Sequence, residues 1–273
     1  MLSQTSDYFF SPFNLEGRFF WGDEPPFSPV QSPCGRIYQE KKGLNGHMLD
    51  AADFVSADKI KMDLEIDLLD FNKAPIWINK NPYNSVRIPW LKKNFPDCVI
   101  VAVIRKPQAN VFSLLKKYIP HEKRGLGPEN GWWGVKPDQW EKMLSRDKVV
   151  QSAKQWRAVN HQLIDHRHLI DLLVDYQAVC EKPGSLIEKI LACYGIQEKI
   201  NISAFPDMND EYKTGSRLLS KNREYKNMGG DFNLSKVIDS DTEIKKLDRK
   251  DLFNIWRQCH GTWKRCLNLT SRL

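Results

Sequence analysis

The sequence predicts an α/β protein with three layers, in which a parallel sheet is flanked by helices. Strand-like and helix-like segments alternate between residues 74 and 196. The clearest strands are residues 99–104 (VIVAVI) and 172–178 (LLVDYQA). The first of them is apolar on both faces, which is typical of a parallel strand buried between layers of helices.

The N-terminal third offers weaker signals. Residues 1–45 are rich in Pro, Phe, Gly and Ser without sustained periodicity, so we expect an irregular region there. Residues 48–70 have apolar positions at mixed helical spacing, which slightly favours a helix. Residues 74–79 (APIWIN) predict a short strand that Lys-Asn-Pro ends, and a helix is expected over 85–94, before Phe-Pro-Asp.

The central segments follow in order. After the strand at 99–104, Arg-Lys-Pro leads into a helix expected over 109–118, because proline is tolerated in the first helical turn. Residues 120–138 are rich in Gly and Pro and predict a long loop with two tryptophans. The apolar spacing over 147–166 predicts an amphipathic helix.

The C-terminal part completes the alternation. A helix is expected over 183–194, where Gly195 stops it. A polar, basic loop is expected over 213–231, and helices over 242–267.

Length and composition fit one soluble domain over residues 1–273, with its core at 74–196 and C-terminal loop and helices at 213–273. The 273 residues are 41% hydrophobic and 27% charged. The longest apolar run, 98–104, is far shorter than the ~18 residues that span a bilayer, and no signal peptide is visible. The six cysteines form no CxxC pair, so we expect reduced thiols and a cytoplasmic location.

The formal net charge of +7 is unevenly distributed along the chain. Residues 1–79 carry 7 Lys/Arg against 12 Asp/Glu, whereas residues 80–136 carry 11 against 3. A solvated cationic face is the simplest interpretation of the basic segment. The functional alternatives are binding of nucleic acid, of an acidic surface, or of a small ligand that bears phosphate or sulfate.

Two cations of this segment, Lys80 and Arg105, follow predicted strands. Because ligands bind beyond the carboxyl ends of parallel strands, we expect both at the same rim of the sheet. Ser113 lies on the following helix, eight residues after Arg105, and a guanidinium with a hydroxyl suits a phosphate monoester. Spacing alone favours a structural alternative, in which Arg105 pairs with a carboxylate and Ser113 bonds its own backbone.

Four segments, in this order, resemble the sulfotransferases that use 3′-phosphoadenosine 5′-phosphosulfate. The longest segment is INKNPYNSVRIPWLKKNFPDCVIVAVIRKPQANVFSLLKKY. It contains, in order, a Lys-Asn-Pro that resembles the family's Lys-Thr-Pro, then Phe-Pro-Asp, a strand, Arg-x-Pro and a Ser. KQWRAVNHQLIDH resembles the family's Trp-and-Asn helix, and LLVDYQAVCEKPGSLIEKILACYGI resembles its strand–Tyr-Glu–helix–Leu-Gly segment. The resemblance covers about residues 76–196 and implies a P-loop NTPase-like sulfotransferase fold.

The resemblance implies roles residue by residue. Arg105 and Ser113 match the pair that binds the 3′-phosphate of the donor. Lys80 matches the Lys of Lys-Thr-Pro, near the transferring group, with Asn81 in place of the Thr.

Further matches lie toward the C-terminus. Tyr176 matches the Tyr of Tyr-Glu, with Gln177 in place of the Glu. The basic loop with Lys221 and Arg223 lies where the family often closes a loop over the 3′-phosphate, although a solvated loop is the simpler interpretation.

One part of the family pattern has no counterpart here. The family begins with a strand and a loop resembling Pro-Arg-Ser-Gly-Thr-Thr, whose backbone N–H groups hold the 5′-phosphosulfate. No such stretch occurs in this sequence. Three interpretations stay open: a truncated chain whose first strand is missing, a start codon assigned too late, or loss of the loop and with it of catalysis.

The acceptor side is marked by carboxylates and tryptophans. A base must take the proton of the acceptor hydroxyl, and Asp23 and Glu24 match by position the acidic residue that relatives use. They can equally be ordinary loop carboxylates. Trp132 and Trp133 either stack on an acceptor sugar or hold their loop against the core.

The resemblance implies a sulfotransferase that moves a sulfuryl group to a hydroxyl of a carbohydrate or glycolipid, without a metal. The expected partners are a small-molecule donor and acceptor, with no nucleic acid and no transmembrane segment. The alternatives are a catalytically impaired, nucleotide-binding relative and a nucleic-acid-binding protein. A P-loop NTPase would need a Walker loop, which is absent.

Overall fold

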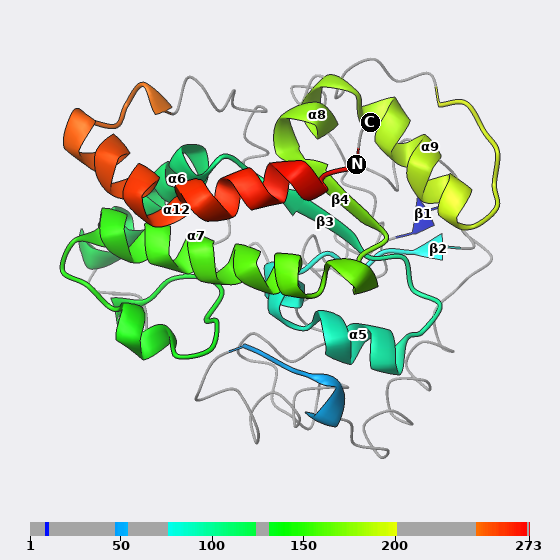
Figure 1. The fold of residues 1–273 in the computed structure, drawn as a ribbon, viewed down its shortest axis with the longest axis horizontal. Coiled ribbons are helices and arrows are strands. Elements are labelled where there is room, and N and C mark those ends of the chain that lie inside the picture. Colours follow the sequence, from blue (N-terminus) through cyan, green and yellow to red (C-terminus); the bar gives the residue numbers. More distant parts are fainter. Residues whose placement is uncertain (1–8, 11–46, 54–75, 124–130, 201–243, 272) are drawn as a thin grey trace, which may run out of the picture. The chain divides into compact units, whose positions relative to one another are not determined.

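The computed structural model describes residues 9–10, 47–53, 76–123, 131–200, 244–271 and 273 (Figure 1). The chain divides into two compact units. Unit 1 comprises Met1–Leu44, Asp53–Pro82 and Phe205–Lys236, and unit 2 comprises Asn45–Ala52, Tyr83–Ala204 and Val237–Leu273.

Unit 1 contains a parallel pair of short strands. β1 (Phe9–Phe10) pairs with β2 (Ile76–Trp77), with Phe9 opposite Ile76. The strand expected over 74–79 is thereby confirmed in its centre. The prediction that 1–45 is irregular is wrong at Phe9–Phe10, because a strand of two residues has no periodicity and is defined by its partner alone.

Unit 2 holds the second parallel pair and most of the described helices. Its elements, in chain order, are η3 (Pro82–Val86, which begins at the last residue of unit 1), α5 (Ile88–Asn94), β3 (Val101–Ile104), α6 (Pro107–Lys123), η5 (Trp140–Met143), α7 (Lys148–Asp165), η6 (Arg167–Leu169), β4 (Leu172–Asp175), α8 (Tyr176–Glu181), α9 (Pro183–Cys193) and α12 (Arg249–Leu269). A 3₁₀ turn, η2 (Ala51–Asp53), ends the described part of the segment predicted as a helix over 48–70.

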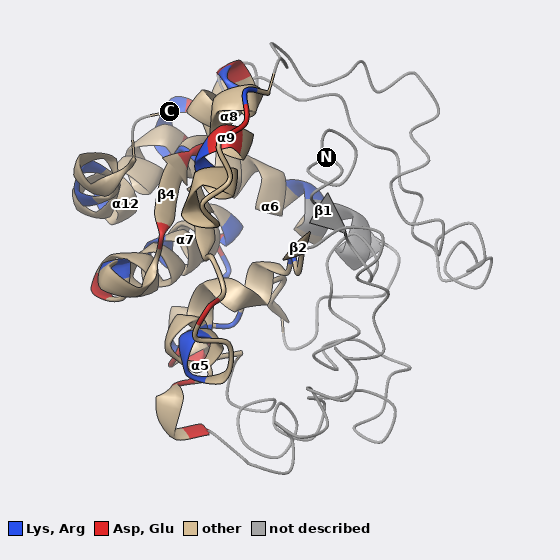
Figure 2. Ribbon diagram, turned by 90° about the vertical axis from the view of Figure 1, so that its right-hand side faces the viewer, with Lys and Arg blue, Asp and Glu red and all other residues tan. Residues whose placement is uncertain are grey.

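β3 and β4 run parallel and are flanked by helices, which confirms the predicted α/β class. Val101 lies opposite Leu172, and Ile104 lies opposite Asp175. The face with Ile104 packs into a core shared with α7 and α12. Figure 2 shows these two helices on one side of β4 and α9 on the other. Val103, on the opposite face of β3, is 48% exposed, so the strand is less completely buried than its apolar sequence predicts.

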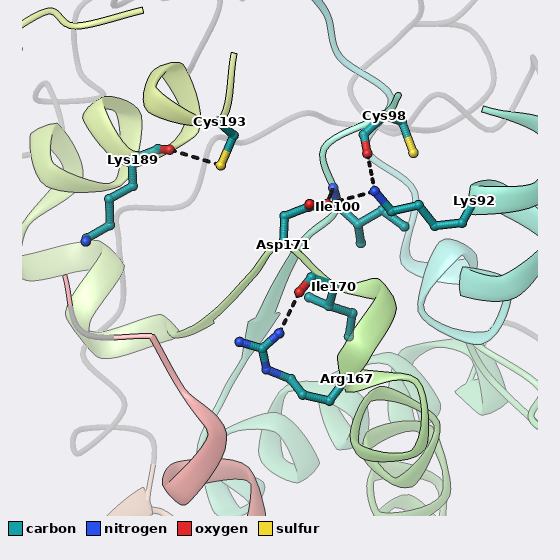
Figure 3. Close-up of polar contacts among 8 residues, drawn as sticks. All are labelled: Lys92, Cys98, Ile100, Arg167, Ile170, Asp171, Lys189 and Cys193. Atoms are coloured by element: carbon teal, nitrogen blue, oxygen red, sulfur yellow. Dashed lines mark hydrogen bonds and ion pairs between the residues drawn. The ribbon is translucent and has the colours of Figure 1, made fainter. Parts of the chain in front are cut away.

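The amino ends of the two strands are tied by Asp171 (Figure 3). Its Oδ2 accepts a hydrogen bond from the Ile100 amide at 2.7 Å and forms an ion pair with Lys92 Nζ at 3.1 Å. Lys92 Nζ also donates to the carbonyl of Cys98 at 2.6 Å. One carboxylate thus connects α5, the start of β3 and the start of β4.

The other edge of β4 meets the C-terminal segment. The Ser271 amide donates to the Leu173 carbonyl at 2.6 Å, and Arg167 Nε donates to the Leu269 carbonyl at 3.3 Å. The first bond satisfies a carbonyl at the edge of the strand, and both bonds anchor the end of α12 near it.

Two helices begin and end close to their predicted bounds. The expected helix over 147–166 is α7: the Asp147 carboxylate accepts from the amides of Val149 and Val150 at 2.9 and 3.2 Å and caps it. The expected helix over 183–194 is α9, which Gly195 follows with a φ of +74°. That left-handed conformation is accessible to glycine at little cost.

Other bounds differ from the predictions. The strand expected over 172–178 ends at Asp175, whose carboxylate accepts from the amides of Gln177 and Ala178 and starts α8. The helix expected over 109–118 runs from Pro107 to Lys123, so the predicted loop at 120–138 begins later.

Helices are predicted over 242–267, and α12 (Arg249–Leu269) covers most of this segment. The Asp248 carboxylate caps it by accepting from the Asp251 amide at 2.7 Å. The cap stops the helix from extending backward, because a capping residue leaves the helical conformation.

We expect the substitution Asp171→Ala to lower the free energy of unfolding by about 1–3 kcal/mol, because it leaves the Ile100 amide and Lys92 without their shared acceptor. Chemical denaturation measures this difference. Asp97→Ala is the matched control: this neighbouring carboxylate is exposed and has no hydrogen bond or ion pair to any described residue. Equal effects of the two substitutions would contradict the role of Asp171.

Candidate functional site

Arg105 and Tyr176 lie together at the carboxyl edge of the β3–β4 pair. Ile104 and Asp175 are opposite each other in the register, so the residues that follow them leave adjacent strands at the same rim. The guanidinium carbon of Arg105 lies 4.7 Å from the centre of the Tyr176 ring, over its face. A cation in this position is attracted by the ring electrons.

The backbone on both sides of this contact is held by neighbouring elements. The indole Nε1 of Trp156, in α7, donates to the Arg105 carbonyl at 3.1 Å. Trp156 is itself buried in the core between α6, α7 and α12. Tyr176 is the first residue of α8 and directly follows Asp175, the cap of that helix. The contact therefore depends on a core side chain and on a helix start.

Cys180 is a third member of this cluster, which the sequence analysis missed. It lies one helical turn after Tyr176 on α8, and its thiol shares a hydrogen bond with the Tyr176 side chain. Burial raises the pKa of the Cys180 thiol, and the Tyr176 hydrogen bond and the Arg105 charge oppose that shift only in part. The thiol is thus protonated at neutral pH. Its proximity follows from α8, which the sequence pattern did not predict.

The structure also describes two other predicted site residues, Ser113 and Lys80. Ser113 is half-buried in the second turn of α6, six residues after its start, which is about 9 Å along the axis. Lys80 is exposed and lies three residues beyond β2, whose partner strand is β1. The described strands therefore do not put Lys80 and Arg105 on one sheet, and the expected common rim stays a prediction.

Four predicted site residues lie outside the described part of the chain: Asp23, Glu24, Lys221 and Arg223. Their assignments as base and as 3′-phosphate ligands stay predictions.

Trp132 is built into its loop. Only 2% of its surface is exposed, its Nε1 donates to the Val135 carbonyl at 3.0 Å, and its ring meets Trp140 edge-on at 5.5 Å. This burial supports the alternative in which Trp132 holds the loop against the core. Trp133 is half-buried, and its amide donates to the Tyr118 hydroxyl at 3.1 Å.

Two glutamines of α7 hold the same loop. Gln155 Nε2 donates to the carbonyls of Trp133 and Val135 at 2.8 and 2.9 Å. Gln151 Nε2 donates to the Gly131 carbonyl at 2.8 Å. α7 therefore positions both the loop with the tryptophans and, through Trp156, the backbone of Arg105.

A second buried polar cluster surrounds His47. Its amide donates to the Lys136 carbonyl at 2.8 Å, and its Nδ1 accepts from the Lys136 amide at 2.9 Å. Its ring stacks on Tyr83 at 3.9 Å, and its carbonyl accepts from Arg87 Nε at 2.8 Å. No local pattern could reveal this cluster, because Arg87 and Lys136 lie 40 and 89 residues from His47 in the sequence.

Within the described ranges, no group of three or more His, Cys, Asp or Glu residues could hold a metal ion. No helix in those ranges combines the length and the apolar character that crossing a membrane requires.

We expect Gln155→Leu to lower the free energy of unfolding by about 1–3 kcal/mol, because two loop carbonyls lose their donor in a buried site. Amide hydrogen exchange within residues 131–136 should become faster. Gln162→Leu, the same substitution on a less buried position of α7, is the control and should change neither measurement by a comparable amount. Unchanged exchange in Gln155→Leu would contradict this role.

One comparison with known proteins identifies a family for this chain. The family model described as "Sulfotransferase family" matches residues 36–199, which is more than half of the chain. The matched range contains Lys80, Arg105, Ser113 and Tyr176. No curated protein and no solved structure matches the sequence. The chain belongs to the sulfotransferase family.

Proposed function

We propose that the protein transfers a sulfuryl group from 3′-phosphoadenosine 5′-phosphosulfate to a hydroxyl group of a carbohydrate or glycolipid. The single observation that supports this donor most directly is the Arg105 guanidinium on the Tyr176 ring, at the carboxyl edge of parallel strands. It lies within the range that matches the family. Ligands of open α/β sheets bind at such edges.

The chemistry of Arg105 suits the 3′-phosphate of this donor. A guanidinium donates hydrogen bonds in its own plane, where its fork matches two phosphate oxygens. Ser113 would add a hydroxyl donor from α6. Trp156 would position Arg105 by holding its carbonyl, and Cys180, as a neutral thiol, would add no charge to the site.

The remaining roles complete the transfer. The donor supplies a sulfuryl group whose S–O bond to the 5′-phosphate breaks as the acceptor oxygen bonds to sulfur. Lys80 would neutralise charge on the leaving oxygen, and Asp23 or Glu24 would take the acceptor's proton. Lys221 and Arg223 would add positive charge around the 3′-phosphate. The protein thus contributes positioning and charge, as enzymes of phosphoryl transfer do.

We expect adenosine 3′,5′-bisphosphate to raise the melting temperature of the protein far more than adenosine 5′-monophosphate does, because only the first carries the 3′-phosphate. Arg105→Ala should lower the affinity for the bisphosphate by about 10- to 100-fold and leave the weak binding of the monophosphate unchanged. Isothermal titration measures both affinities.

Lys116→Ala is the control for charge, because Lys116 is an exposed cation of α6. An equal loss of affinity for the bisphosphate in Lys116→Ala would contradict the proposed donor. So would an absence of stabilisation of the wild-type protein by the bisphosphate. Stabilisation by a DNA oligomer instead would favour nucleic-acid binding.

We expect Lys80→Ala to reduce turnover by at least about 100-fold while it changes the affinity for the bisphosphate by only a few fold, because its charge acts on the leaving oxygen. Transfer of labelled sulfate to a panel of carbohydrates and glycolipids measures turnover. Lys245→Ala, another exposed lysine, is the control. An unchanged rate in Lys80→Ala would discard this role, and donor binding without transfer in the wild type would indicate a catalytically impaired relative.

A further inference from the structure

The C-terminal helix α12 presents two different faces. Its inner face is buried and lies against α6 and α7, with Ile255, Cys259, Thr262 and Cys266 at a spacing of three or four residues. Its outer face is exposed, and Figure 2 shows α12 at the left-hand edge of the described helices. The outer face is therefore available to a partner.

Large apolar side chains gather on this outer face. Phe253 is 59% exposed, Trp256 is 53% exposed and Leu267 is 43% exposed. The Phe253 and Trp256 rings stack at 6.3 Å, and the Trp256 ring lies 5.0 Å from that of His260. The spacing of three, four and seven residues places these four side chains on one side of the helix. We call them the aromatic stripe; it extends over about 21 Å.

Positive charge borders the aromatic stripe. The exposed charged side chains of α12 are all basic. Those on or beside the stripe are Arg249, Lys250, Arg257 and Lys264, whereas Arg265 lies about 180° around the axis from Trp256. The single acidic residue of the helix, Asp251, is half-buried and lies about 140° around the axis from Trp256.

This combination fits an anionic lipid surface better than other partners. Trp and Phe beside Lys and Arg on one convex helix face are typical of helices that lie in the plane of a membrane interface. A purely ionic ligand such as a polysaccharide would engage the cations and leave Phe253 and Leu267 in water. An exposed apolar group of this kind marks an interaction site.

We propose that the outer face of α12 docks the protein on the surface of an anionic lipid bilayer. Phe253 and Trp256 enter the headgroup layer, and Arg257 and Lys264 contact the lipid phosphates. Each basic residue near such a surface contributes about 1 kcal/mol, which is about fivefold in affinity. This docking does not depend on the proposed sulfuryl transfer.

Sedimentation of the full-length protein with vesicles tests the proposal. We expect binding to vesicles of phosphatidylcholine with phosphatidylglycerol, little binding to phosphatidylcholine alone, and weaker binding at high salt. The double variant F253A/W256A should bind at least about 10-fold more weakly, and R257Q/K264Q about 25-fold more weakly. Both pairs are exposed, so neither variant should unfold the protein.

Two controls separate lipid insertion from other effects. Leu144→Ala removes an exposed apolar side chain outside α12 (40% exposed) and should leave binding unchanged. Trp256→Phe should keep binding but lose much of the fluorescence quenching that brominated lipids cause in the wild type.

Four outcomes would overturn the proposal. They are an absence of binding, equal affinity for neutral and anionic vesicles, unchanged binding by F253A/W256A, and binding to heparin without binding to vesicles. Self-association in sedimentation velocity that F253A/W256A abolishes, without vesicle binding, would assign the stripe to a contact between copies instead.

Discussion

The parallel pairing of β3 with β4 is the interaction on which the candidate site depends. Its register places Ile104 opposite Asp175, so Arg105 and Tyr176 leave the sheet side by side. At the opposite end of the pair, Asp171 joins both strands to α5. A slip of one residue would turn each side chain of a strand to the other face of the sheet and would separate the guanidinium from the ring.

α7 connects this sheet edge to the rest of unit 2. Trp156 holds the Arg105 carbonyl, and Gln151 and Gln155 hold the loop that carries Trp132. The Asn160 side chain in turn donates to the Trp156 carbonyl at 2.8 Å. One helix thus positions the proposed donor site and the loop with the two tryptophans. Its opposite flank supports α12, whose outer face carries the proposed lipid contact.

Local patterns predicted the elements whose ends have local causes. α7 is capped by its own Asp147, and α9 ends before Gly195, so both were found within one or two residues. The apolar run of β3 was also sufficient to predict that strand. α8 was missed because Asp175 both ends a strand and caps a helix, and β1 was missed because a strand of two residues is defined only by its partner.

The sequence by itself determined the fold class, the order of most elements, and Arg105 and Tyr176 as residues of interest, because periodicity, caps and family-like motifs are local properties. Only the tertiary structure decided that Arg105 lies on the Tyr176 ring, that Cys180 joins them, and that Trp132 is buried. The His47 cluster and the exposed stripe of α12 were likewise decided by packing. Such contacts join residues far apart in the chain, and burial depends on what packs against a surface rather than on the residue that lies there.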